Sequence, residues 1–267
     1  MDKLARYLRH GHRVRGWLDR YSAIFIADLC RCQSEHGIFG SVAEIGVHMG
    51  RLFLLLNLAK LPGEKSLAID VFSDQHLNVD ESGYGNREKF LSNVAKWCGD
   101  QNIEIIQKSS LDLSVREILD RVGPCRIMSI DGGHTEECVL NDLRLAEGVL
   151  LDKGVVVLDD FFQQSWPGVA SGASRHMLDQ TTALRPFCIT PNKLYLSRLP
   201  CRDIYRSFFA VTHFDKFEKT VTIFGCEVDV YGCYPPRYTF KYRIKEMIKA
   251  SPVGPISVKI FRAMRGY

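Results

Sequence analysis

The sequence has no run of about 18 apolar residues, the length that a helix needs to cross a membrane. Its longest apolar stretch, Leu52–Ala59, is interrupted by Asn57. The first residues, Met1–Leu4, have no apolar core of the kind found in secretory signals. We therefore expect a cytoplasmic protein without a transmembrane span.

The sequence also lacks any Cys-x-x-Cys pair, although it contains nine cysteines. They are scattered singly, apart from Cys30 and Cys32. An odd number without paired spacing argues against a disulfide framework and against a zinc site. It indicates reduced, mostly buried thiols.

Acidic residues are nearly absent from the C-terminal segment. From Arg237 onward, eight basic residues stand against Glu246 alone, a formal charge of +7. Because the whole chain carries +4, the preceding residues carry −3. The tail is a candidate for peripheral contact with anionic lipid, and a solvated helix packed on the domain is the alternative. The slightly acidic remainder argues against nucleic-acid binding.

Between about residues 42 and 162, short apolar segments alternate with amphipathic ones, as in parallel βαβ units. The expected strands are Val42–His48, Ser66–Phe72, Ile103–Ser109, Arg126–Asp131 and Gly154–Asp160. The expected helices are Arg51–Lys60, Asn86–Cys98, Val115–Val122 and Thr135–Leu150. Because such crossovers are right-handed, the pattern predicts an α/β fold with a doubly wound, mostly parallel sheet, which binds ligands at the carboxyl ends of its strands.

The flanking segments have a different pattern. We expect N-terminal helices within residues 1–20 and 22–35, followed after the parallel region by further elements at Ala173–Thr182 (helix), Phe187–Thr190 with Lys193–Ser197 (hairpin) and 217–230 (short hairpin). The chain then divides into an N-terminal helical segment (1–40), a central domain (41–200) and a C-terminal extension (201–267) with the short hairpin and the basic tail.

A glycine-bearing turn connects the first of these strands to its helix, in the run AEIGVHMG at residues 43–50. Gly46 and Gly50 permit a tight turn and a close approach of a ligand to the backbone. The second strand ends in Asp70, which is placed to accept both hydroxyls of a ribose. Together they indicate a nucleoside-bearing cofactor, and an ordinary turn with a helix-capping aspartate stays open. The run lacks the G-x-G-x-x-G spacing that seats a pyrophosphate, which counts against NAD.

Carboxylates directly follow two buried strands, at Asp131 and at Asp159 and Asp160. Unpaired burial would be costly, and neighbouring parallel strands end about 5 Å apart, so these oxygens can converge on one hard cation such as Mg²⁺. Because successive strand residues face opposite sides, Asp159 and Asp160 can both bind only if the chain turns there. Helix capping by Asp131 and a polar loop at Asp159 and Asp160 are the alternatives.

With the runs SIDGGH (129–134) and VVVLDDF (155–161), these features resemble the class I S-adenosylmethionine (SAM) methyltransferases. More narrowly, they resemble the Mg²⁺-dependent sugar O-methyltransferases of the macrocin and mycinamicin type, over about residues 16–197. The resemblance implies a Rossmann-like, seven-stranded sheet. It also implies a set of site residues, namely Glu44, Gly46, Gly50 and Asp70 for SAM, Asp131, Asp159 and Asp160 for Mg²⁺ or Mn²⁺, and His134 as catalytic base. We add Ser109 and Ser110, at the third strand end, as residues expected to face the adenine.

The implied reaction transfers a methyl group from SAM to a hydroxyl of a small molecule or glycan, with a sugar as the acceptor. The metal would lower the pKa of that hydroxyl, and His134, with a reference pKa of about 6.5, would accept its proton. A helix-start histidine without catalytic duty is the alternative for His134. Placement in line with the S–CH₃ bond supplies the rest, and no covalent enzyme intermediate is needed.

Other functions stay open. Catechol O-methyltransferases have a similar layout, but they typically carry Lys where His134 stands and Asn where Asp160 stands. A non-catalytic SAM- or nucleotide-binding module would bind ligand without turnover. The sequence is also compatible with a homo-oligomer.

The segment 73–85 (SDQHLNVDESGYG) is long for a connection between a strand and a helix, and such loops are often lids or binding loops. Asp74, His76 and Asp80 are candidates to contact sugar hydroxyls or to cover SAM, and a flexible surface loop is the alternative. Trp166 and His176 are candidates to line the acceptor pocket, with packing roles as the alternative.

Overall fold

The computed structural model describes residues 2–99 and 102–233. Met1–Tyr231 forms one compact unit and Gly232–Tyr267 a second, of which only Gly232 and Cys233 are described. The basic tail from Arg237 onward, with its expected contact to anionic lipid, lies outside the described residues. Within the described part, no helix is long and apolar enough to cross a membrane.

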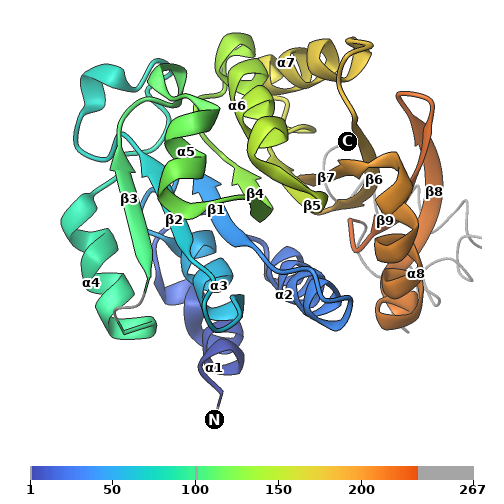
Figure 1. Cartoon of the computed structure of the whole chain (residues 1–267), viewed down its shortest axis with the longest axis horizontal. Coiled ribbons are helices and arrows are strands. Elements are labelled where there is room, and N and C mark those ends of the chain that lie inside the picture. Colours follow the sequence, from blue (N-terminus) through green and yellow to red (C-terminus); the bar gives the residue numbers. More distant parts are fainter. Residues whose placement is uncertain (1, 100–101, 234–267) are drawn as a thin grey trace, which may run out of the picture. The chain divides into compact units, whose positions relative to one another are not determined.

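A single mixed sheet organises the first unit, with the strand order β3-β2-β1-β4-β5-β7-β6-β9-β8 (Figure 1). The strands are β1 (Ser41–Ile45), β2 (Ser66–Asp70), β3 (Ile103–Gln107), β4 (Cys125–Ile130), β5 (Leu150–Asp159), β6 (Leu184–Thr190), β7 (Lys193–Arg198), β8 (Phe217–Ile223) and β9 (Cys226–Tyr231). From β3 to β5 all pairings are parallel, and β7 then runs antiparallel between β5 and β6. The predicted α/β fold with a mostly parallel, doubly wound sheet is confirmed.

The sheet has nine strands among the described residues, so the expected number of seven was wrong. The two additional strands are the hairpin β8–β9, which we had expected as a separate short hairpin. It joins the sheet because β9 pairs in parallel with β6, with Cys188 opposite Asp229 and Ile189 opposite Val230. Residues 201–231 therefore contribute to the same compact unit as the central strands.

Helices cover the sheet on both faces (Figure 1). They are α1 (Lys3–His10), α2 (Arg20–Glu35), α3 (Arg51–Ala59), α4 (Arg87–Trp97), α5 (Val115–Val122), α6 (Glu136–Val149), α7 (Pro167–Leu178) and α8 (Arg202–Thr212), with 3₁₀ turns at Gly11–Arg13, Gln75–Leu77, Ser110–Asp112, Leu199–Cys201 and Phe214–Lys216. Helix α7 begins six residues before the expected Ala173, because Pro167 occupies its first turn, where a missing N–H costs nothing. The sequence analysis did not anticipate α8.

Alternation along the strands divides the apolar core into two layers. Val42 of β1 packs with side chains of α1 to α4 and α8 on one face, while its neighbour Ala43 packs with α5, α6 and α7 on the other. Successive strand residues point to opposite faces, so a strand covered on both sides must be apolar throughout. This explains why the second half of β5, Val155–Leu158, reads as a continuous apolar run.

A buried ion pair fastens the first layer of helices to β4. The guanidinium of Arg126 donates two parallel hydrogen bonds to Glu64, at 2.8 and 3.0 Å. A third bond, of 2.6 Å, reaches Gln33 Oε1 on α2. Arg126 and Glu64 are both fully buried, so each charge depends on the other for its stability.

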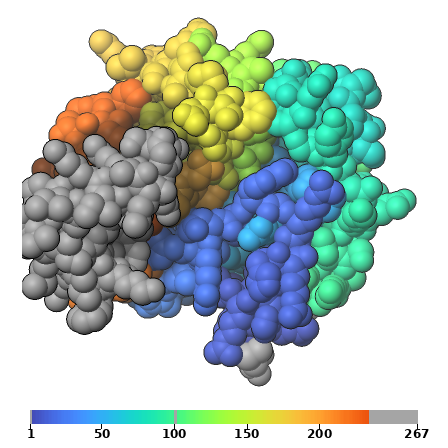
Figure 2. All heavy atoms as spheres, turned by 180° about the vertical axis from the view of Figure 1, so that it is seen from behind, coloured from blue at the N-terminus to red at the C-terminus, as the bar shows by residue number. Residues whose placement is uncertain are grey.

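The N-terminal helix α1 packs on the same layer of helices, against α3 and α4. Figure 2 shows residues of the N-terminal segment, in blue, beside the green-cyan segment that contains α4. The ring of Tyr7 meets the edge of Trp97 with 5.1 Å between centroids, and its hydroxyl donates to the Arg51 carbonyl at 2.7 Å. The polar end of Tyr7 is thereby satisfied while its ring is buried.

Candidate active site

A cavity of about 390 Å³ lies at the carboxyl ends of the parallel strands. Most of the predicted site residues line it, namely Gly46, Asp70, Ser109, Ser110, Asp131, His134, Asp159 and Asp160. Neither Glu44 nor Gly50 is among its lining residues. This volume is within the range of small-molecule sites, and its place on the sheet is the one expected for ligands of an open α/β fold.

The turn after β1 brings the ends of β1 and β4 into direct backbone contact. Gly46 has φ +85°, and a Cβ added to it would lie 1.7 Å from the Asp131 carbonyl oxygen. In return, the Asp131 N–H donates to the Ile45 carbonyl at 2.9 Å. No side chain fits at position 46, so glycine here is a steric requirement.

Two of the predicted cofactor residues, Glu44 and Gly50, lie close to the glycine turn but do not line the cavity. Gly50 has φ +91° and caps the start of α3, and a Cβ there would lie 2.9 Å from the Phe90 ring. Glu44 is buried within β1, where burial, followed by the charge of Asp131, raises its pKa well above the usual range. Both residues support the turn that carries Gly46.

Asp70, at the end of β2, holds the backbone of the glycine turn at His48. One carboxylate oxygen accepts the His48 N–H at 2.6 Å, and the other accepts the Phe72 N–H at 2.5 Å. Burial nevertheless raises the pKa of Asp70, because it outweighs these bonds. Ser109 and Ser110 line the cavity from the end of the neighbouring β3.

Three side chains gather into a cluster that can hold a metal ion. One ligand atom each from Asp131, His134 and Asp160 lies within 4.8 Å of the others. Asp160 takes part because the chain turns there, with φ +58°, immediately after the last residue of β5. Burial raises the pKa of Asp131 well above its usual range, and the adjacent Asp159 raises it further. A cation at this point would relieve the crowding of negative charge.

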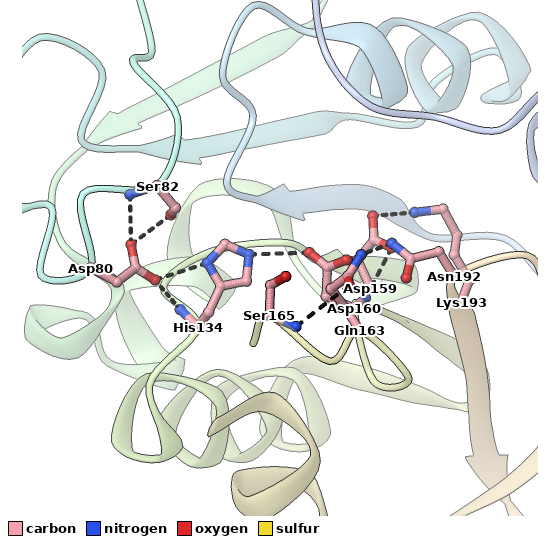
Figure 3. Close-up of polar contacts among 9 residues, drawn as sticks. All are labelled: Asp80, Ser82, His134, Asp159, Asp160, Gln163, Ser165, Asn192 and Lys193. Atoms are coloured by element: carbon pink, nitrogen blue, oxygen red, sulfur yellow. Dashed lines mark hydrogen bonds and ion pairs between the residues drawn. The ribbon is translucent and has the colours of Figure 1, made fainter. Parts of the chain in front are cut away.

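Asp159 lies beside this cluster but is engaged elsewhere (Figure 3). One of its oxygens forms a buried ion pair with the Lys193 ammonium, and the other accepts the Asn192 amide at 3.0 Å. The same amide donates to Asp160 at 2.5 Å. Sequence reasoning missed both Asn192, in the turn between β6 and β7, and Lys193, the first residue of β7. Lys193 places a positive charge among the carboxylates.

His134 is held on three sides. Its Nδ1 lies 2.8 Å from Asp80 Oδ2, its Nε2 lies 3.2 Å from Asp160 Oδ2, and Trp166 stacks on its ring at 4.3 Å (Figure 3 shows both carboxylates). Burial alone would lower the pKa of His134, but the bonds to Asp160 and Asp80 outweigh it and raise the pKa to about 9. The ring is therefore fixed in orientation beside the carboxylates.

The two candidate residues for the acceptor pocket, Trp166 and His176, lie in different surroundings. Trp166 lines the cavity, but His176 is buried in α7, where its Nε2 lies 3.0 Å from Glu147. His176 therefore has the packing role. The segment 73–85 contributes Asp80 to the site together with several lining residues, so it belongs to the cavity wall.

Comparisons with known proteins agree with this geometry. Residues 43–161 match the family model described as a methyltransferase domain. The structure is similar to that of the O-methyltransferase NovP, with a TM-score of 0.55 and 14% identity over 66% of this chain and 80% of that chain. It is also similar to the O-methyltransferase TomG from Streptomyces achromogenes in complex with SAM, with a TM-score of 0.52 and 17% identity over 73% and 88% of the two chains. No curated protein matches the chain by sequence.

These similarities bear on the fold and on the domain. The matched residues run from β1 to the residue after Asp160, so they contain the glycine turn and the acidic cluster. Residues 43–161 thus match a methyltransferase domain, and the chain shares its fold with solved O-methyltransferases.

Proposed function

We propose that this enzyme is a divalent-metal-dependent O-methyltransferase that methylates a hydroxyl of a sugar, in a glycan, a glycolipid or a glycosylated metabolite. The observation that carries the proposal is the cluster of Asp131, His134 and Asp160, within 4.8 Å, in the same cavity as Gly46 and Asp70. A donor site and an acceptor site thus share one wall, the carboxyl end of β4.

The SAM site would occupy the cavity beside β1, β2 and β3. The backbone of Gly46, which lines the cavity, would lie against the cofactor, Asp70 would receive its ribose hydroxyls, and Ser109 and Ser110 would face its adenine. Glu44 and Gly50 would hold the turn from behind. When bound, SAM supplies a methyl group on a positively charged sulfur.

The donor set fits a hard cation. Asp131 and Asp160 offer carboxylate oxygens, and the three aspartates of the site outnumber the single Lys193 ammonium beside them. Asp159 would join as a third carboxylate by releasing Lys193. When bound, Mg²⁺ or Mn²⁺ would lower the pKa of a neighbouring acceptor hydroxyl.

His134 would hold and move the proton. Its Nδ1 lies against Asp80, so Nε2 is the atom that faces the cluster. A cation bound by Asp131 and Asp160 would lower the raised pKa of His134, and Nε2 would then be able to accept the acceptor hydroxyl's proton. Trp166 excludes water from one face of the ring. Oxygen as the methylated atom is supported by the names of NovP and TomG, which are both O-methyltransferases.

The decisive experiment incubates the purified chain with radiolabelled SAM and separate panels of glycosides, nucleotide sugars and catechols, with Mg²⁺ or with EDTA. We expect labelled sugars, with the label lost in EDTA and in Asp160→Ala. Labelling of catechols alone would replace the acceptor class, and full activity in EDTA would remove the metal from the mechanism. SAM binding without methyl transfer to any panel would indicate a binding module.

A further inference from the structure

A carboxylate outside the acidic cluster contacts His134 from a distant part of the chain. Asp80 Oδ2 accepts the backbone N–H of His134 at 2.5 Å and lies 2.8 Å from Nδ1 of the same residue. The two residues are 54 positions apart in the sequence. One oxygen therefore holds both the main chain and the ring of His134, in the loop between β4 and α6.

The other oxygen of Asp80 is held by its own loop (Figure 3). Asp80 Oδ1 accepts the Ser82 N–H at 3.0 Å and the Ser82 hydroxyl at 2.5 Å. The side chain of Asp80 is only 9% exposed. Burial would raise its pKa, but the hydrogen bonds from His134 and Ser82 outweigh it and hold the pKa below the usual range. Both oxygens of Asp80 thus accept hydrogen bonds in this site, Oδ1 from Ser82 and Oδ2 from the His134 N–H.

The contact with Asp80 holds one ring nitrogen of His134 and thereby directs the other. Nδ1 lies 2.8 Å from Asp80 Oδ2, and Nε2 faces Asp160 in the cluster at 3.2 Å. Rotation of the ring would break this bond and the stacking on Trp166. The orientation of His134 is set by a side chain whose hydrogen bonds are to His134 and Ser82, and not to Asp131 or Asp160.

We propose that Asp80 is the positioning residue for His134. The segment 73–85 then belongs to the active site, because it contains this carboxylate. The proposal rests on the proposed function for the role of His134 as base. The geometric part, that Asp80 fixes the ring through Nδ1, stands independently of any acceptor. A partner of this kind typically contributes ten- to a hundredfold to activity.

The first test reads the ring directly, without acceptor or cofactor. Asp80→Ala and the isosteric Asp80→Asn are compared with wild type and with Glu81→Gln, which removes the same charge from an exposed neighbour in the loop. We expect a slowly exchanging, downfield Nδ1–H proton signal of His134 in wild type and Glu81→Gln, and its loss in both Asp80 variants. Persistence of that signal in the folded Asp80 variants would overturn the proposal.

The second test measures turnover on the acceptor found above. We expect kcat to fall about ten- to a hundredfold in Asp80→Asn, while KM for the acceptor and the Kd for SAM change less than about threefold. In Asp80→Ala, added formate should restore at least part of kcat by occupying the space of the lost carboxylate, with no effect on Glu81→Gln. A purely structural role predicts a lower melting temperature, weaker SAM binding and no rescue, and that result would also overturn the proposal.

The two tests separate the two proposals. If the Nδ1–H signal depends on Asp80 but no acceptor is methylated, the positioning holds and the proposed function fails. If wild type methylates sugars and the folded Asp80 variants keep full kcat, the proposed function holds and the positioning role fails.

Discussion

Lys193 forms a buried ion pair with Asp159, the residue directly before Asp160 of the acidic cluster. The ammonium is only 2% exposed, and its pKa is raised because the charges of Asp159 and Asp131 outweigh the effect of burial. The site therefore contains a buried positive charge beside the carboxylates before any metal ion arrives. An incoming cation must compete with it.

Removal of this ammonium should strengthen metal binding. In Lys193→Gln, we expect the Kd for Mg²⁺ to fall at least about tenfold, because a unit charge about 6 Å from a divalent ion is worth about 1.4 kcal/mol even at the dielectric of water. Isothermal titration of the cofactor-free enzyme measures it. Lys216→Gln removes the same charge from an exposed pair with Asp215 and should leave the Kd unchanged. Weaker Mg²⁺ binding in Lys193→Gln would place the ion away from these carboxylates.

Position 46 should tolerate no side chain. In Gly46→Ala, the new methyl group would clash with the Asp131 carbonyl, so we expect a loss of about 3 kcal/mol or more in the free energy of unfolding, together with loss of SAM binding. Gly37→Ala is the matched control, because Gly37 also has positive φ but nothing lies within 4 Å of an added Cβ. It should cost only about 1–2 kcal/mol. Urea denaturation and SAM titration check both variants, and equal losses would contradict the steric argument.

The buried pair between Arg126 and Glu64 should be strongly coupled. Arg126→Met leaves Glu64 buried without its partner, so we expect a loss of about 3–5 kcal/mol, of which the double variant Arg126→Met/Glu64→Leu regains a large part. Arg116→Met, which breaks a pair with Asp120 that is 88% and 69% exposed, should change stability by less than about 1 kcal/mol. A double-mutant cycle by urea denaturation measures the coupling. Additive losses would refute it.

Glu147 should make a pH-dependent contribution to stability. Burial would raise its pKa, but hydrogen bonds from His176, Thr182 and the Ala183 N–H outweigh it and lower the pKa to about 2. Because the pKa of Glu147 is about 4.5 in the unfolded chain and about 2 in the fold, its ionised form stabilises the fold at pH values above 4.5. This stability is lost as the pH falls from 4.5 towards 2. Glu147→Gln should therefore be about 1 kcal/mol less stable than wild type at pH 7, and the difference should shrink between pH 4.5 and 2. Thermal melts of wild type and Glu147→Gln across this pH range measure the difference in stability, with the exposed Glu137→Gln as control. A difference that stays constant with pH would contradict the lowered pKa of Glu147.

The sequence allowed the central sheet and the edge that carries the chemistry to be predicted. Gly46, Asp70, Asp131 and Asp160 each follow an apolar strand, and parallel strands end at one edge, so local pattern was enough to bring them to one cavity. The turn at Asp160 had been named as the condition for its joining the cluster, and its positive φ meets that condition.

What the sequence did not reveal depends on long-range contacts. Lys193 meets Asp159 across 34 residues, and Asp80 meets His134 across 54, and neither pairing has a spacing that a local pattern could carry. The addition of β8 and β9 to the sheet could not be predicted from local pattern either, because the sequence of a hairpin does not indicate which strand of a sheet it will pair with. Helix α8 did have a signal, the apolar pairs Ile204–Tyr205 and Phe208–Phe209 one turn apart.

The contact between Gly46 and the Asp131 carbonyl joins two main-chain segments without an intervening side chain. In the proposed reaction, the donor side of the cavity would begin at one of these segments and the acceptor side at the other. The separation between the methyl donor and the proton acceptor would then depend on main-chain atoms rather than on side chains. Side chains around the rim are then free to diverge for new acceptors while the transfer distance, on which an ångström can cost about a hundredfold in rate, stays constant.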